Sequence, residues 1–343
     1  MSENSNIQWT DATWNPVVGC DKTSPGCLHC YAISDAWRMA HNPNPKISSV
    51  YAGLTHKLPN GIIDWTGVVR LVRDRLSIPV QTGKPQRYFV NSMSDLFHET
   101  LPFADVDEVV AAMILAKANG RQHIFQTLTK RDERLYAYMS SRSEDHELLF
   151  NAADRAFGEE TAIAVANSIN GTLGEGRNAM WPPSNAWWGV SVENRKHGLP
   201  RVDSLRDTPA ALRFLSIEPL LEDIGEINLR GISWVIVGGE SGSQPRALNP
   251  EWVMSIIEQC AAAGVPCFVK QLGARITGDD KLFRTIHQWI TPDGRRHLAP
   301  IVGSLVGVRP SPTVDFALCN RHGGEPGEWP ESLRVREFPE VSQ

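Results

Sequence analysis

Short apolar runs alternate with helical patterns along this chain, and this alternation is the feature that most constrains its fold. Strands that alternate with helices predict βαβ units and a parallel sheet. Over 343 residues the pattern predicts an α/β fold, a partial or full (β/α) barrel of parallel strands with a helical insertion and a C-terminal cap. The expected strands are RYFVNS (87–92), HIFQTLT (123–129), WWGVSV (187–192), RFLSI (213–217), SWVIVGG (233–239) and PCFVKQ (266–271), with a leading strand at 14–19.

Two helices between these strands carry clear start and stop signals. Residues 105–118 have apolar positions at helical spacing and an acidic first turn, and Gly120 follows as a C-terminal stop. Asn249 and Pro250 are typical of a helix start, and that helix is expected to end near Gly264.

The domain organisation follows from these elements. We expect one barrel domain over 1–275, with a cysteine loop at 19–31 and an insertion at about 141–184. The periodicity weakens after that domain, so 276–343 are expected to form a cap or tail. The insertion's glycines neither follow a strand nor open a helix, which argues against a phosphate-binding loop.

Net charge and the distribution of apolar residues bear on whether this protein binds nucleic acid or a membrane. The net charge of −5 provides no global positive field for nucleic acid, although a local basic face could still bind it. No stretch approaches the roughly 20 apolar residues of a membrane helix, and the N-terminus lacks a signal-peptide pattern, so we expect no membrane partner and a cytoplasmic location.

Three of the six cysteines lie within eleven residues, in GCDKTSPGCLHCYA. Cys20, Cys27 and Cys30 group three thiolates, which suit zinc or an iron–sulfur cluster. His29 or His41 could complete a Cys3His zinc site, whereas three cysteines alone leave one iron of a cluster open. Cys260 and Cys267 are expected to be buried thiols, and Cys319 is a weaker candidate for a second cluster.

The cysteine segment resembles the cluster loop of the radical S-adenosylmethionine superfamily. Along the chain the sequence most resembles a phage-associated three-cysteine-motif family of unassigned activity. The resemblance continues through WTDATWNPVVGC, FVNSMSDLFHE, LTKR, WWGVSVEN, LSIEPLL, VIVGGESG, FVKQLG and EWPESLRVREFP. Six residues separate the first two cysteines where the superfamily usually has three, and His29 takes the usual place of an aromatic residue.

The resemblance implies a 4Fe-4S cluster on Cys20, Cys27 and Cys30 whose open iron binds S-adenosylmethionine. One electron would cleave this cofactor to methionine and a 5′-deoxyadenosyl radical that abstracts a substrate hydrogen. A reductant protein such as flavodoxin or ferredoxin would supply the electron. The phage association suggests nucleic acid or a nucleotide as the substrate, with a peptide second.

Polar residues at the carboxyl ends of barrel strands are the remaining site candidates. The resemblance assigns the cofactor's amino group to the end of the second strand. Glu193, Glu218 and Lys130 are the candidate catalytic residues, and Lys130 with Arg131 could instead bind the cofactor carboxylate or a phosphate. The candidate cofactor-binding residues are Asn91, Ser92, Ser94, Asp95, Gly238, Gly239, Glu240 and Ser241.

Two other classes of function stay open. Glu193, Glu218 and Glu240 resemble the paired carboxylates of a barrel hydrolase, which would act without a cofactor. Alternatively, a zinc-stabilised nucleic-acid-binding protein could contact phosphates through Lys130–Arg131, Arg334 and Arg336. Metal analysis separates the second from an iron–sulfur protein.

Overall fold

The computed structural model describes residues 5, 7–170, 181–242, 244–278, 289–290, 296–297, 314–316 and 322–340. Internal contacts divide the chain into two compact units. Unit 1 comprises 1–23, 30–190 and 204–213, and unit 2 comprises 24–29, 191–203 and 214–343.

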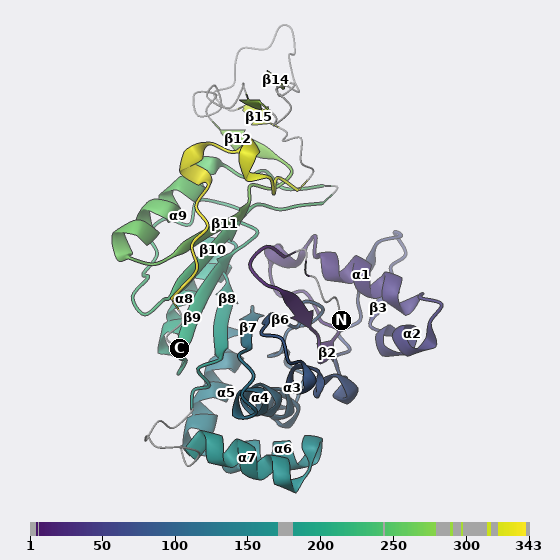
Figure 1. The fold of residues 1–343 in the computed structure, drawn as a ribbon. Helices are drawn as coiled ribbons and strands as arrows, with labels where there is room; N and C mark the ends of the chain where they lie inside the picture. Colours follow the sequence, from purple (N-terminus) through teal and green to yellow (C-terminus); the bar gives the residue numbers. More distant parts are fainter. Residues whose placement is uncertain are drawn as a thin grey trace, which may run out of the picture. The chain divides into compact units, whose positions relative to one another are not determined.

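A seven-stranded sheet is the centre of the fold (Figure 1). Its strand order is β1-β6-β7-β8-β9-β10-β11, and every pairing for which a register is established is parallel. The expected α/β fold is thereby confirmed. In the described part of the chain no pairing joins β1 to β11, so the sheet is open, as in a partial barrel. The strands are β1 (Ala12–Trp14), β6 (Arg87–Val90), β7 (Ile124–Thr129), β8 (Ala186–Ser191), β9 (Leu212–Ile217), β10 (Trp234–Gly238) and β11 (Cys267–Gln271).

Continuous apolar runs form these strands because both faces of a parallel sheet are covered. Every residue of β8 and β10 is buried. The six later strands were predicted to within two residues at each end. The second expected strand, 87–92, ends early at Val90 because Asn91 adopts a left-handed backbone, φ 61°, which cannot continue an extended chain.

The leading strand expected at 14–19 is wrong as one element. Pro16 has no N–H to donate to a sheet ladder, and the chain divides at this point. β1 joins the large sheet, whereas β2 (Val17–Val18) pairs antiparallel with β5 (Arg70–Leu71). Val17 N–H instead donates to Asn91 Oδ1 at 3.1 Å.

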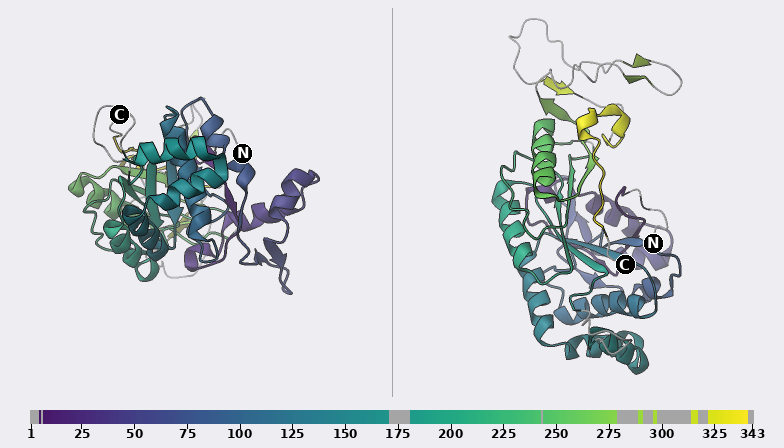
Figure 2. Two further views of the ribbon diagram at one scale, coloured as in Figure 1. Left: turned by 90° about the horizontal axis from the view of Figure 1, so that it is seen from below. Right: turned by 60° about the vertical axis from the view of Figure 1, so that its left-hand side comes forward.

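Helices α4, α6 and α7 pack against one another in unit 1 (Figures 1 and 2). The predicted helix at 105–118 is α4, which begins two residues earlier and is buried from Val106 to Ala116. The helical first part of the predicted insertion is α6 with α7, and 171–180 lie outside the described residues. The unit 1 helices are α1 (Tyr31–Ala40), α2 (Pro45–Tyr51), η2 (Arg73–Arg75), α3 (Ile78–Gln81), α4 (Phe103–Ala118), α5 (Asp132–Glu144), α6 (Glu147–Phe157) and α7 (Glu159–Asn170).

A small lobe between the cysteine loop and β6 was not predicted beyond its first helix. It consists of α1, α2 and a hairpin of β3 (Thr55–Lys57) with β4 (Ile63–Trp65). Ala36, Tyr51 and Leu54 belong to its own apolar core. Its elements are too short to show a period in the sequence.

Unit 2 contains the predicted helix after Asn249. This helix, α9 (Pro250–Ala263), begins with the Asn249 side chain accepting from Glu251 N–H and ends at left-handed Gly264, as expected. The other elements of unit 2 are η1 (Pro25–Cys27), η3 (Pro326–Glu328), η4 (Glu331–Leu333) and two short antiparallel pairs, β12 (Ile276–Gly278) with β15 (Val314–Phe316) and β13 (Trp289–Ile290) with β14 (Arg296–His297). Helix α8 (Arg195–Asp207) begins in unit 2 and ends in unit 1.

The C-terminal segment covers the edge strand β11 (yellow in Figures 1 and 2). Val269 N–H donates to Val335 O, and Glu337 N–H donates to Cys267 O, each at 2.8 Å. The indole of Trp234 donates to Glu337 O at 2.9 Å. These bonds satisfy the exposed edge of the sheet, which would otherwise invite pairing with another chain.

Among the described residues, no helix combines the length and the apolar character needed to cross a membrane.

Candidate functional site

The cysteine loop begins where the chain leaves β2. Gly19 has φ +92°, and a Cβ at this position would lie 2.1 Å from Val68 O, so only glycine fits. Gly19 also forms a parallel bridge with Ser94, just beyond β6. The start of the cysteine loop therefore lies at the carboxyl end of β6. In α/β barrel enzymes the active site forms at the carboxyl ends of the strands.

Each cysteine of the loop occupies a boundary of local structure. Cys20 follows Gly19, Cys27 ends η1, and Cys30 is the residue before α1. All three are partly exposed. As residue types, three thiols in eleven residues are the soft donor set that an iron–sulfur cluster or zinc requires. Cys20 and Cys30 belong to unit 1 and Cys27 belongs to unit 2.

The environment of Cys20 disfavours its thiolate when no metal is bound. Burial raises the pKa of Cys20 to about 12, and the charge of Asp95 adds to this effect while Arg131 opposes it. A metal that binds here would have to displace the proton.

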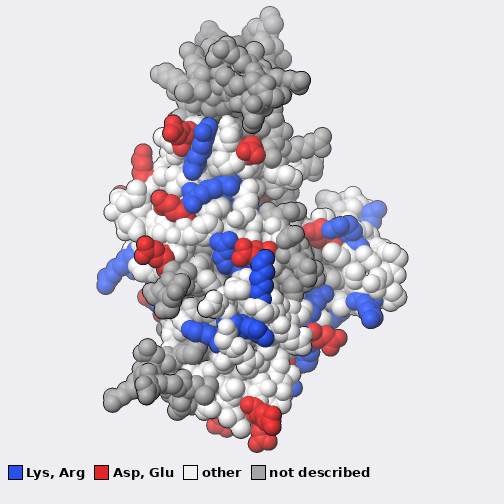
Figure 3. Space-filling view, in the orientation of Figure 1, with Lys and Arg blue, Asp and Glu red and all other residues white. Residues whose placement is uncertain are grey.

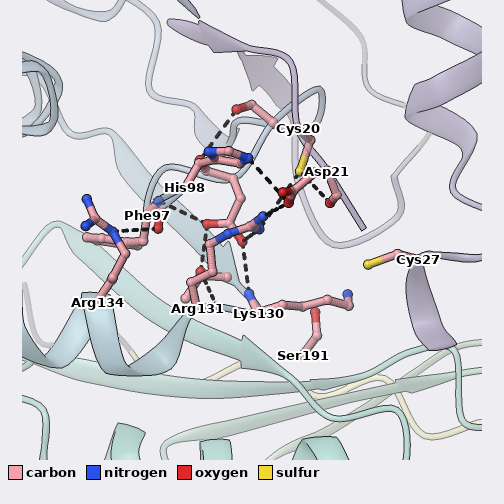
Figure 4. Close-up of polar contacts among 12 residues, drawn as sticks. Cys20, Asp21, Cys27, Phe97, His98, Lys130, Arg131, Arg134 and Ser191 are labelled. Atoms are coloured by element: carbon pink, nitrogen blue, oxygen red, sulfur yellow. Dashed lines mark hydrogen bonds and ion pairs between the residues drawn. The ribbon is translucent and has the colours of Figure 1, made fainter. Parts of the chain in front are cut away.

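A charged cluster surrounds Cys20 in unit 1 (Figure 4). We call it the Arg131 cluster; its members are Arg131, Asp21, Asp95, His98 and Glu99. The Arg131 side chain is only 4% exposed. It donates to Asp95 Oδ2 at 3.0 Å, to Glu99 Oε2 at 2.7 Å and to Asp21 Oδ1, and its Nη1 donates to Cys20 Sγ at 3.9 Å.

Asp95 is the acceptor that holds the cluster together. Its oxygens accept from Phe97 N–H and Lys130 N–H, each at 3.0 Å, and from the Thr129 hydroxyl at 2.7 Å, besides Arg131. Asp95 was predicted to bind a cofactor. Because four protein donors already occupy its carboxylate, its evident role is to join the ends of β6 and β7.

His98, Asp21 and Glu99 each bring one potential metal-ligand atom within 4.8 Å of the others. However, His98 Nδ1 accepts from Thr100 N–H at 3.2 Å. Burial and Arg131 hold the pKa of His98 below its ordinary value, so the ring is neutral and carries its proton on Nε2, which faces Asp21 at 3.3 Å. A protonated nitrogen cannot ligate a metal, and the Asp21 and Glu99 carboxylates both already accept from Arg131.

The predicted residues after β6 lie against the start of the cysteine loop. Asn91 has the left-handed backbone noted above, and its buried Nδ2 has no hydrogen-bond partner among the described residues. Strained polar residues with unsatisfied groups often face ligands. Ser92 Oγ donates to Asn15 Oδ1 at 3.0 Å, and Ser94 forms the bridge to Gly19.

The predicted residues after β10 form a second polar group, within unit 2. Arg246 binds Glu240 through Nη2 to Oε1 at 2.5 Å and Nε to Oε2 at 3.0 Å. His29 Nδ1 lies 3.1 Å from Glu240 Oε2, and Arg246 Nη1 donates to Pro25 O at 2.9 Å. Burial opposes ionisation of Glu240, but Arg246 and His29 outweigh it and lower its pKa. Glu240 thus anchors residues 24–29.

The two glycines before Glu240 serve close packing of the chain. A Cβ on Gly239 would lie 2.3 Å from Leu272 O, and one on Gly238 would lie 3.2 Å from Gln271 O. We expected these glycines to admit a ligand; the close approach that the structure contains is to backbone after β11. Ser241 follows Glu240 in the chain and is partly exposed.

The zinc alternative depends on His29 and His41. Since His29 Nδ1 faces a carboxylate and His41 Nδ1 faces Trp37 O at 2.8 Å, both rings carry their proton on Nδ1 and keep Nε2 as the nitrogen with a lone pair. This is the arrangement found in metal-binding histidines. Both stay candidate fourth ligands.

The three carboxylates of the hydrolase alternative are each held by a cation. Glu193 Oε2 lies 2.7 Å from Arg201 Nη1, and Glu218 Oε1 lies 2.6 Å from Lys270 Nζ. Glu240 is paired with Arg246, as described above. Glu193 is fully buried. Each of the three carboxylates therefore has a cation as its partner, and the hydrolase alternative stays a prediction.

Of the four basic residues of the nucleic-acid alternative, the three arginines contact other groups of the protein, whereas the Lys130 side chain is partly exposed. Arg131 is buried in its cluster. The Arg336 guanidinium lies 5.4 Å from the Phe268 ring centre, and Arg334 donates to Trp329 O at 2.8 Å. On the face shown in Figure 3, basic and acidic side chains are interspersed.

Several residues of these groups were missed or misassigned from sequence. Asp21, Glu99 and Arg246 carry no motif that marks them. Arg131 was considered as a phosphate ligand, and only its carboxylate partners identify it as a buried anchor. Cys260 and Cys267 are buried and in contact, as expected for core thiols, and Cys319 lies outside the described residues.

The parallel sheet, with a cysteine loop that starts at the carboxyl end of β6, defines an α/β protein. Residues 4–299 match the family model described as "Protein of unknown function (DUF5131)". The chain therefore belongs to the DUF5131 family. No curated protein and no solved structure matches it.

Proposed function

We propose that this protein binds a 4Fe-4S cluster through Cys20, Cys27 and Cys30 and reductively cleaves S-adenosylmethionine. The observation that carries the proposal is the group of three thiols within eleven residues, in a loop that starts at the carboxyl end of β6. Three protein ligands leave one iron of such a cluster open, unlike a closed structural zinc site.

The chemistry comes from the cluster, which when bound supplies one electron to the sulfonium and so yields methionine and a 5′-deoxyadenosyl radical. The protein positions the reactants. Ser92 and Ser94 are suited to accept from the cofactor's amino group, because the Asp95 carboxylate is already saturated. The unpaired Nδ2 of Asn91 is a donor and suits a carboxylate.

Substrate handling falls first to Lys130. Its backbone is held by Asp95, and its side chain is partly exposed, whereas Glu193 and Glu218 are held in ion pairs. Nucleic acid or a nucleotide is the proposed substrate class, with a peptide as the second choice. Flavodoxin or ferredoxin is the proposed reductant.

Metal content and cofactor cleavage test this proposal. Anaerobically reconstituted wild type should contain about four irons and release 5′-deoxyadenosine when reduced. Cys27→Ala should lose both properties, since it removes a ligand, whereas Cys260→Ala, in a buried thiol of α9, should retain them. Equal behaviour of wild type and Cys27→Ala would refute the proposal, and one bound zinc without iron would favour the zinc alternative.

A further inference from the structure

We infer that Arg131 raises the reduction potential of a cluster bound through Cys20. The inference rests on the proposed cluster and adds a residue that sets its redox behaviour. Arg131 would be a positioning and tuning residue, because it touches a ligand sulfur and neither cofactor nor substrate.

The geometry that supports this is a direct contact. Arg131 Nη1 is shared between Asp95 Oδ2 at 3.0 Å and Cys20 Sγ at 3.9 Å. Hydrogen bonds to ligand sulfurs and the local charge are two of the factors that set iron–sulfur potentials. A donor on sulfur withdraws electron density and favours the reduced cluster, which carries one more negative charge.

Burial of the Arg131 guanidinium strengthens the effect of its positive charge on a cluster at Cys20. The guanidinium is 4% exposed, so solvent screens it little. A guanidinium is not deprotonated in proteins, so Arg131 stays ionised, and the carboxylates of Asp95, Glu99 and Asp21 all accept from it. Arg131 Nε donates to Glu99 and its Nη2 donates to Asp21. These two bonds hold the guanidinium in the orientation that directs Nη1 toward Cys20.

The carboxylates act in the opposite sense to Arg131. Glu99 partly neutralises the guanidinium, and its side chain is mainly exposed. Removing Arg131 should therefore lower the potential, and removing the Glu99 charge should raise it. A residue that merely stabilised the fold would not produce shifts of opposite sign.

The experiment is a redox titration of reconstituted full-length variants, followed by electron paramagnetic resonance. Arg131→Lys keeps a cation but loses the directed contact, and should shift the equilibrium about tenfold toward the oxidised cluster, or about 59 mV for one electron. Glu99→Gln should shift it toward the reduced cluster. Arg134→Lys is the matched control in the first turn of α5 and should leave the potential unchanged, because Arg134 donates to Phe97 O and Leu101 O and lies over the Phe103 ring.

An unchanged potential in Arg131→Lys, or shifts of the same sign in Arg131→Lys and Glu99→Gln, would overturn the inference. If Arg131→Lys fails to retain iron, Glu99→Gln decides alone, and an unchanged potential in it overturns the inference. Wild type without iron would instead refute the proposed cluster.

Discussion

At the scale of single residues, backbone conformation shapes the start of the cysteine loop. Gly19 and Asn91 both have positive φ, and they lie on the two segments that meet there. Asparagine is one of the few residues other than glycine that adopt this conformation, and the Asn91 Oδ1 accepts from Val17 N–H of the other segment. Gly19 is required for a stronger reason, since the space for a side chain is filled.

Gly19→Ala should destabilise the protein and loosen the cysteine loop. The added Cβ would meet Val68 O at 2.1 Å while φ stays positive, so we expect a loss of about 2 kcal/mol or more in unfolding free energy. Denaturant unfolding measures it. Gly53→Ala is the control, because Gly53 has φ +74° but nothing within 4 Å of a Cβ, and equal losses in the two variants would contradict the steric argument.

At the scale of elements, ion pairs anchor the cysteine loop to strand ends. The residues around Cys20 are held within unit 1 by Arg131, at the end of β7, and residues 24–29 are held within unit 2 by Glu240, after β10. Charge-assisted hydrogen bonds between such groups are stronger than those between neutral groups and are directional. The loop therefore takes its conformation from the sheet.

Glu240→Gln should loosen residues 24–29. The amide loses the charge that pairs with Arg246 and His29, and such bonds to charged groups contribute about 1–3 kcal/mol each. We expect faster hydrogen exchange at Cys27 and Leu28, whose amides donate to Ser24 O and Pro25 O. Glu258→Gln, on the exposed face of α9, should leave their exchange as in wild type. If both variants exchange alike, Glu240 does not anchor the loop.

At the scale of the whole molecule, one buried histidine makes stability depend on pH. His123 Nδ1 accepts from Gln86 N–H at 3.1 Å, and its Nε2 lies 3.0 Å from both Pro79 O and Thr82 O. Burial lowers its pKa in the folded state. The unfolded chain therefore binds the proton more readily, and stability falls as the pH drops below the unfolded pKa of about 6.5.

His123→Gln removes this titration, so its stability should fall less between pH 7.5 and pH 5 than that of wild type. Urea unfolding at the two pH values measures the difference. His56→Gln, at an exposed position of β3, should retain the wild-type dependence. A wild-type loss no larger than that of His123→Gln would show that another group is responsible.

Most of the sheet was predictable, but much less of the site was. The strands and α9 follow from local patterns, such as the continuous apolar run of β10 and the Asn249-Pro250 start. The prediction of one leading strand was wrong because Pro16 divides residues 14–19, which appear continuous in the sequence. The order of the sequence predicted that polar residues follow the strands, but it did not predict which groups they bind. Asp95 and Glu240 were therefore assigned to a cofactor, although protein donors occupy their carboxylates.

The sequence by itself determined where six strands of the large sheet, α4 and α9 lie and that three cysteines share one loop, because apolar runs, caps and short spacings act within a few residues. Only the tertiary structure decided which charged groups meet. Arg131 and Asp21 are 110 positions apart and His29 and Glu240 are 211 apart, and long polar side chains select partners by distance in space. The cysteine loop was therefore readable as a candidate metal site from sequence, while the charged residues that hold it became visible only in the folded chain.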